Sequence, residues 1–486
     1  MKERASDVVQ RIRSWRPSMG TLISLAVALL LVFSFYGFFA PLLQITQQIA
    51  MVIVFALVCI ALLVHLIKVR PHISVALPFI FYLIFFVLII VNNNIDLQDF
   101  IYGSSTRLNG TGLAWFLVFG GTLLSAIYLC NVTTPNWQEI VLKCIALFGL
   151  FYGCFTIIFW IFPSFYDLFY PTLLEISEVT SINGEGYKAG LTTHYSKNGA
   201  FIALGLIAAF CLTLKNRRSY FWAISSCVLL LALVLTTKRG DLIYSVLALV
   251  FVYLLLNSRH LKHALKYLLI VVVIAAVFLL IYSLFDSSLI EVFVRIFEGL
   301  ASGDLNGRES MWELCIEMWQ EHPFFGNGWG SFTQAYNQTA SAAYYVAGGY
   351  TDIDAHNVYL EVLAEEGLVG LIVFVAALAT GIVISVRELL RLNKAEELYQ
   401  EERVYVATSL AVQVFFALMA ITANPLYDYI LFIPYLLSLA MTFAVIRRVN
   451  KSKIGEVPLD SSMQQMSVDD PSDENYDSET AEDLLS

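Results

Sequence analysis

The stretch Ile23–Phe39 reads ISLAVALLLVFSFYGFF and the stretch Leu268–Leu284 reads LLIVVVIAAVFLLIYSL, without a charged side chain in either. Each approaches the length of about 20 apolar residues that a helix needs to cross a bilayer. Of the 486 residues, 58% are hydrophobic and 14% are charged, against about 45–50% and about 25% in soluble domains. This composition excludes a soluble enzyme, a nucleic-acid-binding protein and a disulfide-stapled secreted module. It predicts a polytopic membrane protein.

The hydropathy profile predicts an all-α fold with about 12 transmembrane helices. The expected spans are 19–39, 47–67, 73–91, 112–130, 139–163, 196–214, 220–237, 241–256, 265–285, 367–386, 404–422 and 427–446. We divide the chain accordingly into a basic N-terminus (1–18), spans 1–9 (19–285), a large loop (286–366), spans 10–12 (367–446) and an acidic tail (447–486). The composition of the tail, acidic and nearly without aromatic residues, is typical of disorder.

The distribution of Lys and Arg orients these spans. If the N-terminus is cytoplasmic, most of the 29 Lys and Arg residues fall in cytoplasmic segments, as the positive-inside rule requires. We therefore expect both termini in the cytoplasm and the large loop outside. The basic residues on the outer side are the exceptions: Arg107, Lys188, Lys197, Lys238, Arg239, Arg295 and Arg308.

Lys238 and Arg239 are notable because they stand in a very short outer turn between two apolar spans. Charges at the membrane edge are unfavourable unless they have a partner. One interpretation is a local pair, in which Asp241 neutralises Arg239. The other, which we favour, is an anion site at the depth of the lipid head groups.

The loop 286–366 is far longer than the other outer connections, and such loops are usually functional or disordered. Its sequence favours a folded cap of short helices. The segment Asp352–Glu366 begins with acidic residues, which suit a helix N-terminus. A Gly-rich turn, His322–Gly330, contains a proline that ends the preceding helix. That helix is expected to place one stripe of side chains on a single face: Met311, Trp312, Cys315, Ile316 and Trp319.

Familiar cofactor motifs are absent from the sequence. There is no GxxxxGK[ST], no Rossmann glycine pattern and no HExxH. The seven cysteines form no CxxC motif, so neither a zinc site nor a disulfide framework is predicted. We expect no cofactor and no metal, and no ATP bound by the chain itself.

Several short motifs on the outer side occur in a fixed order. They are Lys238-Arg239-Gly240, Asn306-Gly307-Arg308-Glu309-x-x-Trp312, Pro323-x-x-Gly326-x-Gly328, Ala355-His356-Asn357-x-x-Leu360-Glu361 and Glu366-Gly367. In this order and spacing they resemble the O-antigen ligase/polymerase family of bacterial envelope glycosyltransferases. The strongest stretch runs from Arg308 to Gly370, and the layout of twelve spans with one large outer loop extends the resemblance to most of the chain. The combination is more specific for the superfamily than for any one reaction.

This resemblance implies a GT-C-like membrane fold and a lipid-to-acceptor glycan transfer. Members take a glycan from undecaprenyl pyrophosphate on the outer face of the bacterial cytoplasmic (inner) membrane. They transfer it to a lipid-linked repeat unit (polymerases), to the lipid A core (ligases) or, in some relatives, to a protein side chain. The family is regarded as metal-independent. The implied partners are the undecaprenyl-pyrophosphate-linked glycan, a glycan or lipid A core acceptor, membrane lipids, a polysaccharide chain-length regulator and a flippase, and no nucleic acid.

The resemblance also implies roles for individual residues. Arg239 and Arg308, with Lys238 as a replacement for or supplement to a family arginine, would bind pyrophosphate, because guanidinium groups pair bidentately with phosphate oxygens. His356 would be the catalytic residue, because a neutral imidazole can accept the proton of an acceptor hydroxyl. Direct displacement would then invert the anomeric carbon. The candidate supporting residues are Asn357, Glu366, Trp312, His194, Lys188 and Lys197.

Each residue also has a structural interpretation. His356 could cap the helix that follows it, and Arg308 could pair with Glu309 or Glu313 on a solvated helix face. The pair Glu365–Glu366 could orient His356. Aromatic side chains of the outer loop could stack on sugar rings or form an interfacial belt: Trp312, Trp319, Trp329, Tyr344, Tyr345 and Tyr359.

Three classes of function compete. We favour a glycosyltransferase, with a repeat-unit polymerase ahead of a ligase, since the ligase needs a lipid A core and therefore an outer membrane. A transporter or flippase of lipid-linked oligosaccharide or a small anion has a similar layout, but transporters tend to show paired repeats and interrupted midplane helices. Here the unusual charges gather at the outer edge. A catalytically silent scaffold for polysaccharide assembly is the third class.

Overall fold

The computed structural model describes residues 19–35, 47–92, 116–166, 168, 188–192, 195–215, 220–270, 308–343, 353–395 and 398–453. Every regular element in these ranges is a helix, so the predicted all-α class is confirmed. The main helices are α2 (Met19–Ser34), α4 (Gln47–Val69), α5 (Leu77–Asn92), α8 (Gly121–Leu129), α9 (Asn136–Ile161), α11 (Tyr195–Lys215), α12 (Tyr220–Leu235), α13 (Arg239–Leu256), α16 (Glu309–Glu321), α17 (Ser331–Asn337), α19 (Val358–Leu392), α20 (Gln400–Met419) and α21 (Tyr429–Lys453).

Seven of the described helices are long and apolar enough to cross a membrane, by length and composition. They are Ala50–Val69, Asn136–Ile161, Tyr195–Lys215, Arg239–Leu256, Val358–Ala395, Gln400–Met419 and Tyr429–Ser452. Shorter apolar helices cover Met19–Ser34, Leu77–Asn92, Leu117–Leu129 and Tyr220–Leu235. These helices occupy every predicted span except the ninth (265–285), most of which lies outside the described residues. The chain is a polytopic membrane protein.

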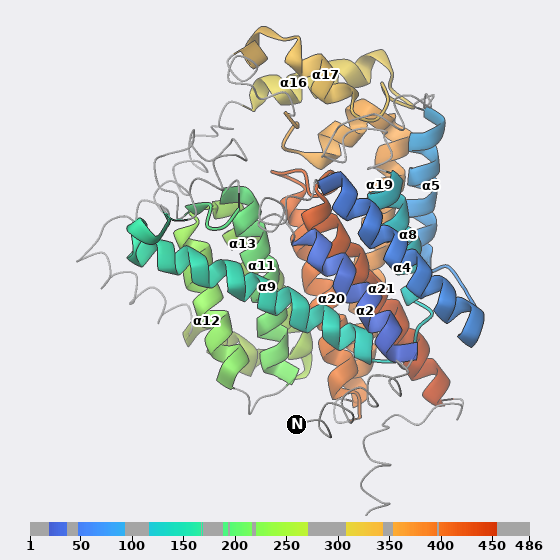
Figure 1. Ribbon diagram of the computed structural model, residues 1–486, viewed down its shortest axis with the longest axis vertical. Coiled ribbons are helices and arrows are strands. Elements are labelled where there is room, and N and C mark those ends of the chain that lie inside the picture. Colours follow the sequence, from blue (N-terminus) through green and yellow to red (C-terminus); the bar gives the residue numbers. More distant parts are fainter. Residues whose placement is uncertain are drawn as a thin grey trace, which may run out of the picture.

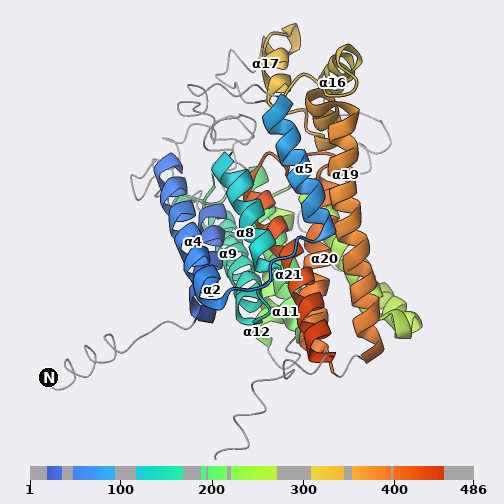
Figure 2. The same cartoon turned by 90° about the vertical axis from the view of Figure 1, so that its right-hand side faces the viewer.

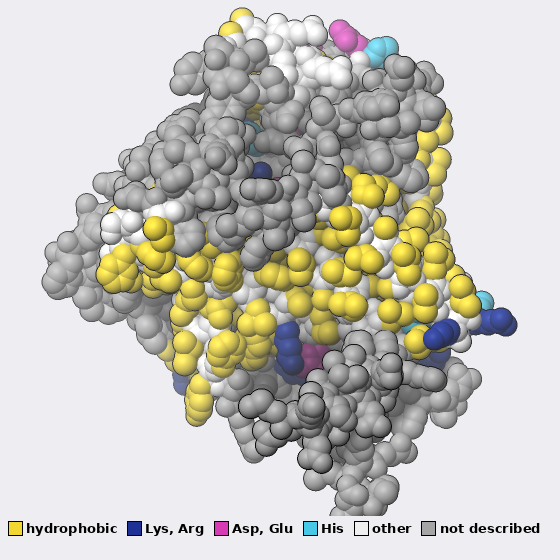
Figure 3. Space-filling model, in the orientation of Figure 1, with side chains coloured by type: hydrophobic (Ala, Val, Ile, Leu, Met, Phe, Trp, Pro, Cys, Tyr) yellow, Lys and Arg dark blue, Asp and Glu magenta, His cyan; other side chains and the backbone are white. Residues whose placement is uncertain are grey.

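Helices α20 and α21 form the centre of the bundle, and most of their residues are buried by the other helices (Figure 1). The surrounding helices leave much of their apolar surface uncovered, and Figure 3 shows these hydrophobic side chains spread across the middle of one face. Where α9 crosses α11, Gly149 and Gly205 meet backbone to backbone, and a Cβ built on Gly149 would lie 2.5 Å from the Cα of Gly205. Small residues at such crossings are typical of helix packing in membranes.

Hydrogen bonds between polar side chains hold the central helices α19, α20 and α21 together inside the bundle. Gln413 donates to Ser385 Oγ (2.8 Å) and to Ser409 Oγ (3.0 Å). Thr442 lies within 2.8 Å of Ser409 and 3.1 Å of Ser385. Buried polar groups of this kind need partners because no water competes for them. The network therefore fixes the relative placement of the three helices that carry the outer site.

Helices α16 and α17 lie together at one end of the molecule, above α5 and the start of α19 (Figures 1 and 2). They enclose a small hydrophobic core of their own, with Met311, Cys315 and Met318 facing Phe332 and Tyr336. The predicted stripe on α16 is thus buried at Met311 and Cys315, while its other members are only partly buried. This cap contains a folded core, as the loop sequence predicted.

The turn 323–328 joins the cap to the bundle by closing a break in α19. At Gly367 (φ 65°, ψ −168°) the helix is interrupted. The amide groups of Leu368 and Val369 donate to the carbonyl oxygens of Pro323 (2.9 Å) and Phe324 (3.1 Å). In the other direction, the amides of residues 327 and 328 donate to the carbonyls of residues 364 and 365, at 3.1 and 2.7 Å. We call this paired backbone, residues 323–328 with 364–369, the clasp.

The glycines of the clasp are there because the backbone requires them. Gly326 (φ 71°) and Gly367 (φ 65°) adopt the left-handed conformation that favours glycine. A Cβ on Gly326 would collide with the backbone of Glu365, and one on Gly367 would collide with the backbone of Phe324. The Pro-x-x-Gly and Glu-Gly motifs of the sequence are therefore the two halves of one structural joint.

Replacing Gly367 by Ala should destabilise the cap, because the new Cβ meets backbone and the positive φ adds strain of about 1–3 kcal/mol. We expect the thermal midpoint of the detergent-purified protein to fall by about 5 °C or more, measured by fluorescence-detected size-exclusion chromatography after heating.

The matched control is Gly153→Ala in α9, where the added Cβ would first meet the Ala232 side chain at 3.2 Å. This variant should shift the midpoint much less. Equal midpoints for Gly367→Ala and the wild type would show that the clasp does not need the glycine.

Candidate functional site

The candidate site is assembled on the turn that connects α20 to α21. The carbonyl of Ala420 accepts the amide of Val358 (2.9 Å), and the carbonyl of Thr422 accepts the Arg308 guanidinium (3.1 Å). The Thr422 hydroxyl lies 2.9 Å from the Tyr244 hydroxyl of α13. One turn therefore contacts the segment after His356, the start of α16 and the start of α13. These are the three places where the sequence predicted functional residues.

The cationic turn before α13 is shaped by an unusual backbone. Thr237 has a φ of +56°, which is rare for a β-branched residue. Lys238 Nζ lies 5.1 Å from the centre of the Tyr195 ring, within the range of a cation–π interaction. Arg239 follows as the first residue of α13. The turn thus points a lysine toward the beginning of α11.

Asp241 is buried in the first turn of α13 and packs against Gly199 of α11. The positive charge of Lys238 acts on its carboxyl group. A Cβ at Gly199 would collide with the Asp241 carboxylate, so the glycine is what lets α11 approach the turn. The acid therefore supports the position of Lys238.

Arg308 lies at the N-cap of α16, partly buried between the cap and the bundle. Its hydrogen bond goes to the Thr422 carbonyl, and the hydroxyls of Tyr195 and Tyr244 are near enough to interact with its charge. Burial lowers the pKa of the guanidinium, because desolvation disfavours its charged form. Among the described residues Arg308 has no ion pair, so the pairing with neighbouring glutamates of α16 is wrong.

His356 is exposed and has a φ of +55°. Only a few per cent of non-glycine residues adopt such a conformation, with Asn, Asp and His enriched among them, and residues in such conformations cluster at ligand and active sites. The helix-capping role belongs to the next residue, since Asn357 Oδ1 accepts the amide of Leu360 at 3.1 Å. The structure thus assigns the capping of α19 to Asn357.

The residue before His356 is fixed from both sides. Ala355, which is buried, accepts a hydrogen bond from Trp312 Nε1 (3.0 Å) and donates its amide to Glu361 Oε2 (3.0 Å). The Nε1–H group of Trp312 is therefore used in the contact between α16 and the segment that precedes α19. Trp312 supports the histidine segment through the backbone.

Glu361 links this segment to the α20–α21 turn. Its carboxylate is fully buried and also accepts a hydrogen bond from the side-chain amide of Asn424. Because Thr422, two residues earlier, holds Arg308, the Glu361–Asn424 contact ties the histidine and the arginine to the same few residues. The relative position of His356 and Arg308 is thus set by this turn.

The two neighbouring acids, Glu365 and Glu366, are part of the clasp and contact the residues around it. Glu365 accepts hydrogen bonds from the Tyr427 hydroxyl (2.7 Å) and the Phe332 amide (3.2 Å). Burial, with the adjacent Glu365 carboxylate, raises the pKa of Tyr427 and keeps its hydroxyl a donor. Glu366, also buried, lies 3.4 Å from the side-chain amide of Asn92 at the end of α5. These contacts connect the two acids to the clasp and to the end of α5.

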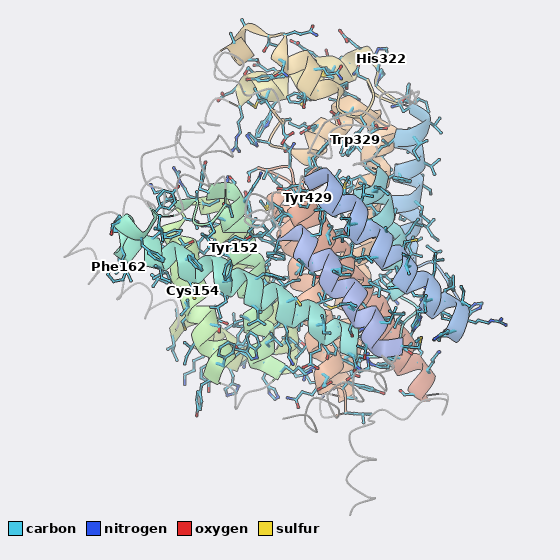
Figure 4. The ribbon with its side chains drawn as sticks, viewed as in Figure 1. Tyr152, Cys154, Phe162, His322, Trp329 and Tyr429 are labelled. Atoms are coloured by element: carbon cyan, nitrogen blue, oxygen red, sulfur yellow. The ribbon has the colours of Figure 1, made fainter. Side chains whose placement is uncertain are left out.

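Several outer aromatic residues are part of the packing. Trp329 is buried beneath the cap, stacked on Tyr427 at 4.4 Å between ring centres (Figure 4). The Tyr359 hydroxyl donates to the carbonyl of Ala417 (2.9 Å). Tyr344 and Tyr345 lie outside the described residues.

The remaining candidates fall at the α11 side of the site or away from it. The carbonyl of Lys188 accepts a hydrogen bond from Asn198 (2.9 Å), and Lys197 lies in the first turn of α11, two residues after Tyr195. His194, like Arg107 and Arg295, lies outside the described residues. His322 is exposed at the far edge of the cap (Figure 4).

Residues 224–375 match the family model described as O-antigen ligase (Wzy_C). This match supports the resemblance of residues 224–375 to the O-antigen ligase/polymerase family. No curated protein matches the chain closely enough to count as a relative. The matched range includes the cationic turn, Arg308, the clasp and His356, so the elements that converge on the site are those of the family domain.

The turn that assembles the site lies beyond the range of the O-antigen ligase match and was missed from sequence. Thr422 and Asn424 stand in a short polar break, ITANPLYDY (421–429), between two predicted outer-facing span ends. That position was the available signal, since it places the turn on the same side as the other motifs. Tyr195 and Tyr244 carried no motif of their own, and Glu361 stood only at the end of the motif Ala355–Glu361. In the described ranges no group of three or more His, Cys, Asp or Glu side chains is spaced to hold a metal ion.

Trp312→Phe tests the support of the histidine segment. The substitution removes the indole donor to Ala355 and should cost about 1 kcal/mol, seen as faster amide hydrogen exchange in residues 353–358 with a small fall in thermal midpoint. Trp319→Phe is the control, since it removes an exposed indole bond to the Pro323 carbonyl (3.1 Å). Unchanged exchange in Trp312→Phe would contradict the assigned role.

Proposed function

We propose that this protein is a glycosyltransferase that moves a glycan from undecaprenyl pyrophosphate to a sugar acceptor, polymerising surface-polysaccharide repeat units. Its site faces the outer side of the bacterial cytoplasmic membrane, and both termini lie in the cytoplasm. The observation that carries the proposal is the convergence of Arg308 and the His356 segment on the α20–α21 turn. The family match supports a lipid-linked glycan substrate in general.

The basic side chains stabilise the negative charge of the departing pyrophosphate. Lys238, Arg239 and Arg308 stand at the ends of helices on one side of the bundle. Undecaprenyl pyrophosphate carries its charge at the membrane surface, where a partly buried guanidinium without an ion pair among the described residues is a strong electrostatic partner. Preorganised cations at a developing charge typically contribute about 10²–10³ in rate.

His356 acts as the base that accepts the proton of the acceptor hydroxyl. In the proposed step the acceptor hydroxyl oxygen forms a bond to the anomeric carbon while the bond from that carbon to the phosphate oxygen breaks. The hydroxyl proton passes to the His356 imidazole, and both electrons of the broken bond leave with undecaprenyl pyrophosphate, held by the arginines. A single displacement of this kind inverts the anomeric centre. The exposed side chain on a fixed backbone suits an acceptor that arrives from outside.

The direct test uses the full-length protein in nanodiscs with the undecaprenyl-pyrophosphate-linked repeat unit of its native host, in the presence of EDTA. His356→Asn removes the imidazole, while asparagine tolerates the positive φ. We expect turnover to fall by about 10²–10⁴. Arg308→Ala and Arg239→Ala should lose about 10²–10³. Arg308→Lys should recover only part, since bidentate pairing is lost. Product ladders are read by mass spectrometry.

The matched control is Arg259→Ala, an exposed arginine beyond the other end of α13, which should leave the ladder unchanged. Transfer only after a lipid A core is added would identify a ligase. Wild-type turnover in His356→Asn would refute the catalytic assignment, and absence of product with every acceptor would favour transport instead.

Glu361 should act as a positioning residue for the same reaction. Glu361→Ala removes the acceptor of the Ala355 amide and the partner of Asn424. Misplacement by about 1 Å can cost about 10²-fold in rate, so kcat should fall while the donor KM changes little. Glu361→Gln keeps an acceptor for the amide and should recover most of the turnover. Equal kcat values for wild type and Glu361→Ala would exclude this role.

A further inference from the structure

Two phenylalanines on the clasp are exposed although everything around them is packed. The side chains of Phe324 and Phe325 are 64% and 58% exposed. They follow Pro323 at the edge of the cap, next to His322, which is labelled in Figure 4. The mechanism proposed above uses neither ring. Adjacent large apolar side chains in water are unfavourable, so a partner surface is expected to cover them.

The clasp gives the two rings a fixed place. The carbonyls of Pro323 and Phe324 accept the amides of Leu368 and Val369, and the carbonyl of Phe325 accepts the side-chain amide of Asn92. The backbone on both sides of the rings is therefore hydrogen-bonded to α19 and to the end of α5. These phenylalanines are held on a rigid joint and do not belong to a loose loop.

The same hydrogen bonds set the depth of the rings relative to the bilayer. Phe324 is paired with Val369, in the first turn of α19 after the break, where the long apolar part of that helix begins. Phe325 is paired with Asn92, the last residue of α5. Both rings thus lie where two apolar helices end, which is the boundary between acyl chains and head groups.

The surface beside the rings is already of the kind that faces lipid. Val91 of α5 is 72% exposed and Ile372 of α19 is 59% exposed. Figure 2 shows α5 and α19 side by side below the cap, and Figure 3 shows hydrophobic side chains continuing up the right-hand edge of the molecule toward it. Exposed apolar side chains of α5 and α19 therefore lie close to the clasp.

We infer that Phe324 and Phe325 insert into the lipid leaflet on the cap side and anchor the cap to the bilayer. The partner is the acyl region just below the phospholipid head groups. Aromatic side chains are favoured at this depth, and a short apolar element can lie in the interface without spanning it. The anchor goes beyond the proposed reaction and does not depend on it: it holds the cap, with Arg308 and Trp312, at a constant height above the membrane.

Photo-crosslinking tests this contact independently of activity. Benzoylphenylalanine is introduced at position 324 or 325 of the full-length protein, where it replaces an aromatic ring of related shape. The protein is reconstituted in nanodiscs of phosphatidylcholine and phosphatidylglycerol with a radiolabelled phospholipid. After irradiation, we expect lipid adducts at both positions, at a yield comparable to that of the same probe at Val91.

Glu321, exposed at the end of α16, is the negative control and should give at least tenfold less labelled adduct. Yields at 324 and 325 no higher than at Glu321 would overturn the inference. Crosslinked dimers of the chain in place of lipid adducts, in discs loaded with two copies, would also overturn it and assign the rings to a protein interface. A symmetrical gel-filtration peak confirms the folding of each variant before irradiation.

Discussion

The break in α19 at Gly367 is the constraint on which the outer half of the molecule depends. A helix interrupted at Gly367 leaves amide and carbonyl groups without helical partners, and buried backbone groups require such partners. The turn 323–328 supplies those partners from the backbone, so the cap and the bundle share one hydrogen-bonded joint. Helix α16, which follows Arg308, leads into that turn, and the segment with His356 leads into α19. The joint therefore fixes the positions of both Arg308 and His356.

A second joint, the α20–α21 turn, converts this placement into a site. Its carbonyls and side chains contact Val358, Arg308 and Tyr244, which come from three separate elements. The buried Glu361–Asn424 contact closes the connection. Such a buried polar link is stable only when its members are paired, which explains why the acids behind the histidine are structural.

The residues that fix the backbone of the site differ from the residues that we propose to act on the substrate. The partly buried side chains of Trp312 and Asn357 fix the backbone on either side of His356, and the buried Asp241 packs against the cationic turn. Positive φ values occur at Thr237 and His356, so both functional turns carry backbone strain that the surrounding contacts must sustain. The family match covers these elements but ends before the turn that joins them, so the C-terminal helices complete the site.

The sequence by itself determined the class of fold and the approximate position of the apolar helices, because apolar length is a local property. Its ordered motifs also led to the family. The tertiary structure alone decided what each motif residue does: Gly326 and Gly367 form a joint, Asn357 caps a helix, and Glu361 reaches Asn424. These roles depend on contacts between segments tens of residues apart, and no periodicity in a single sequence encodes which distant backbone group a side chain will meet.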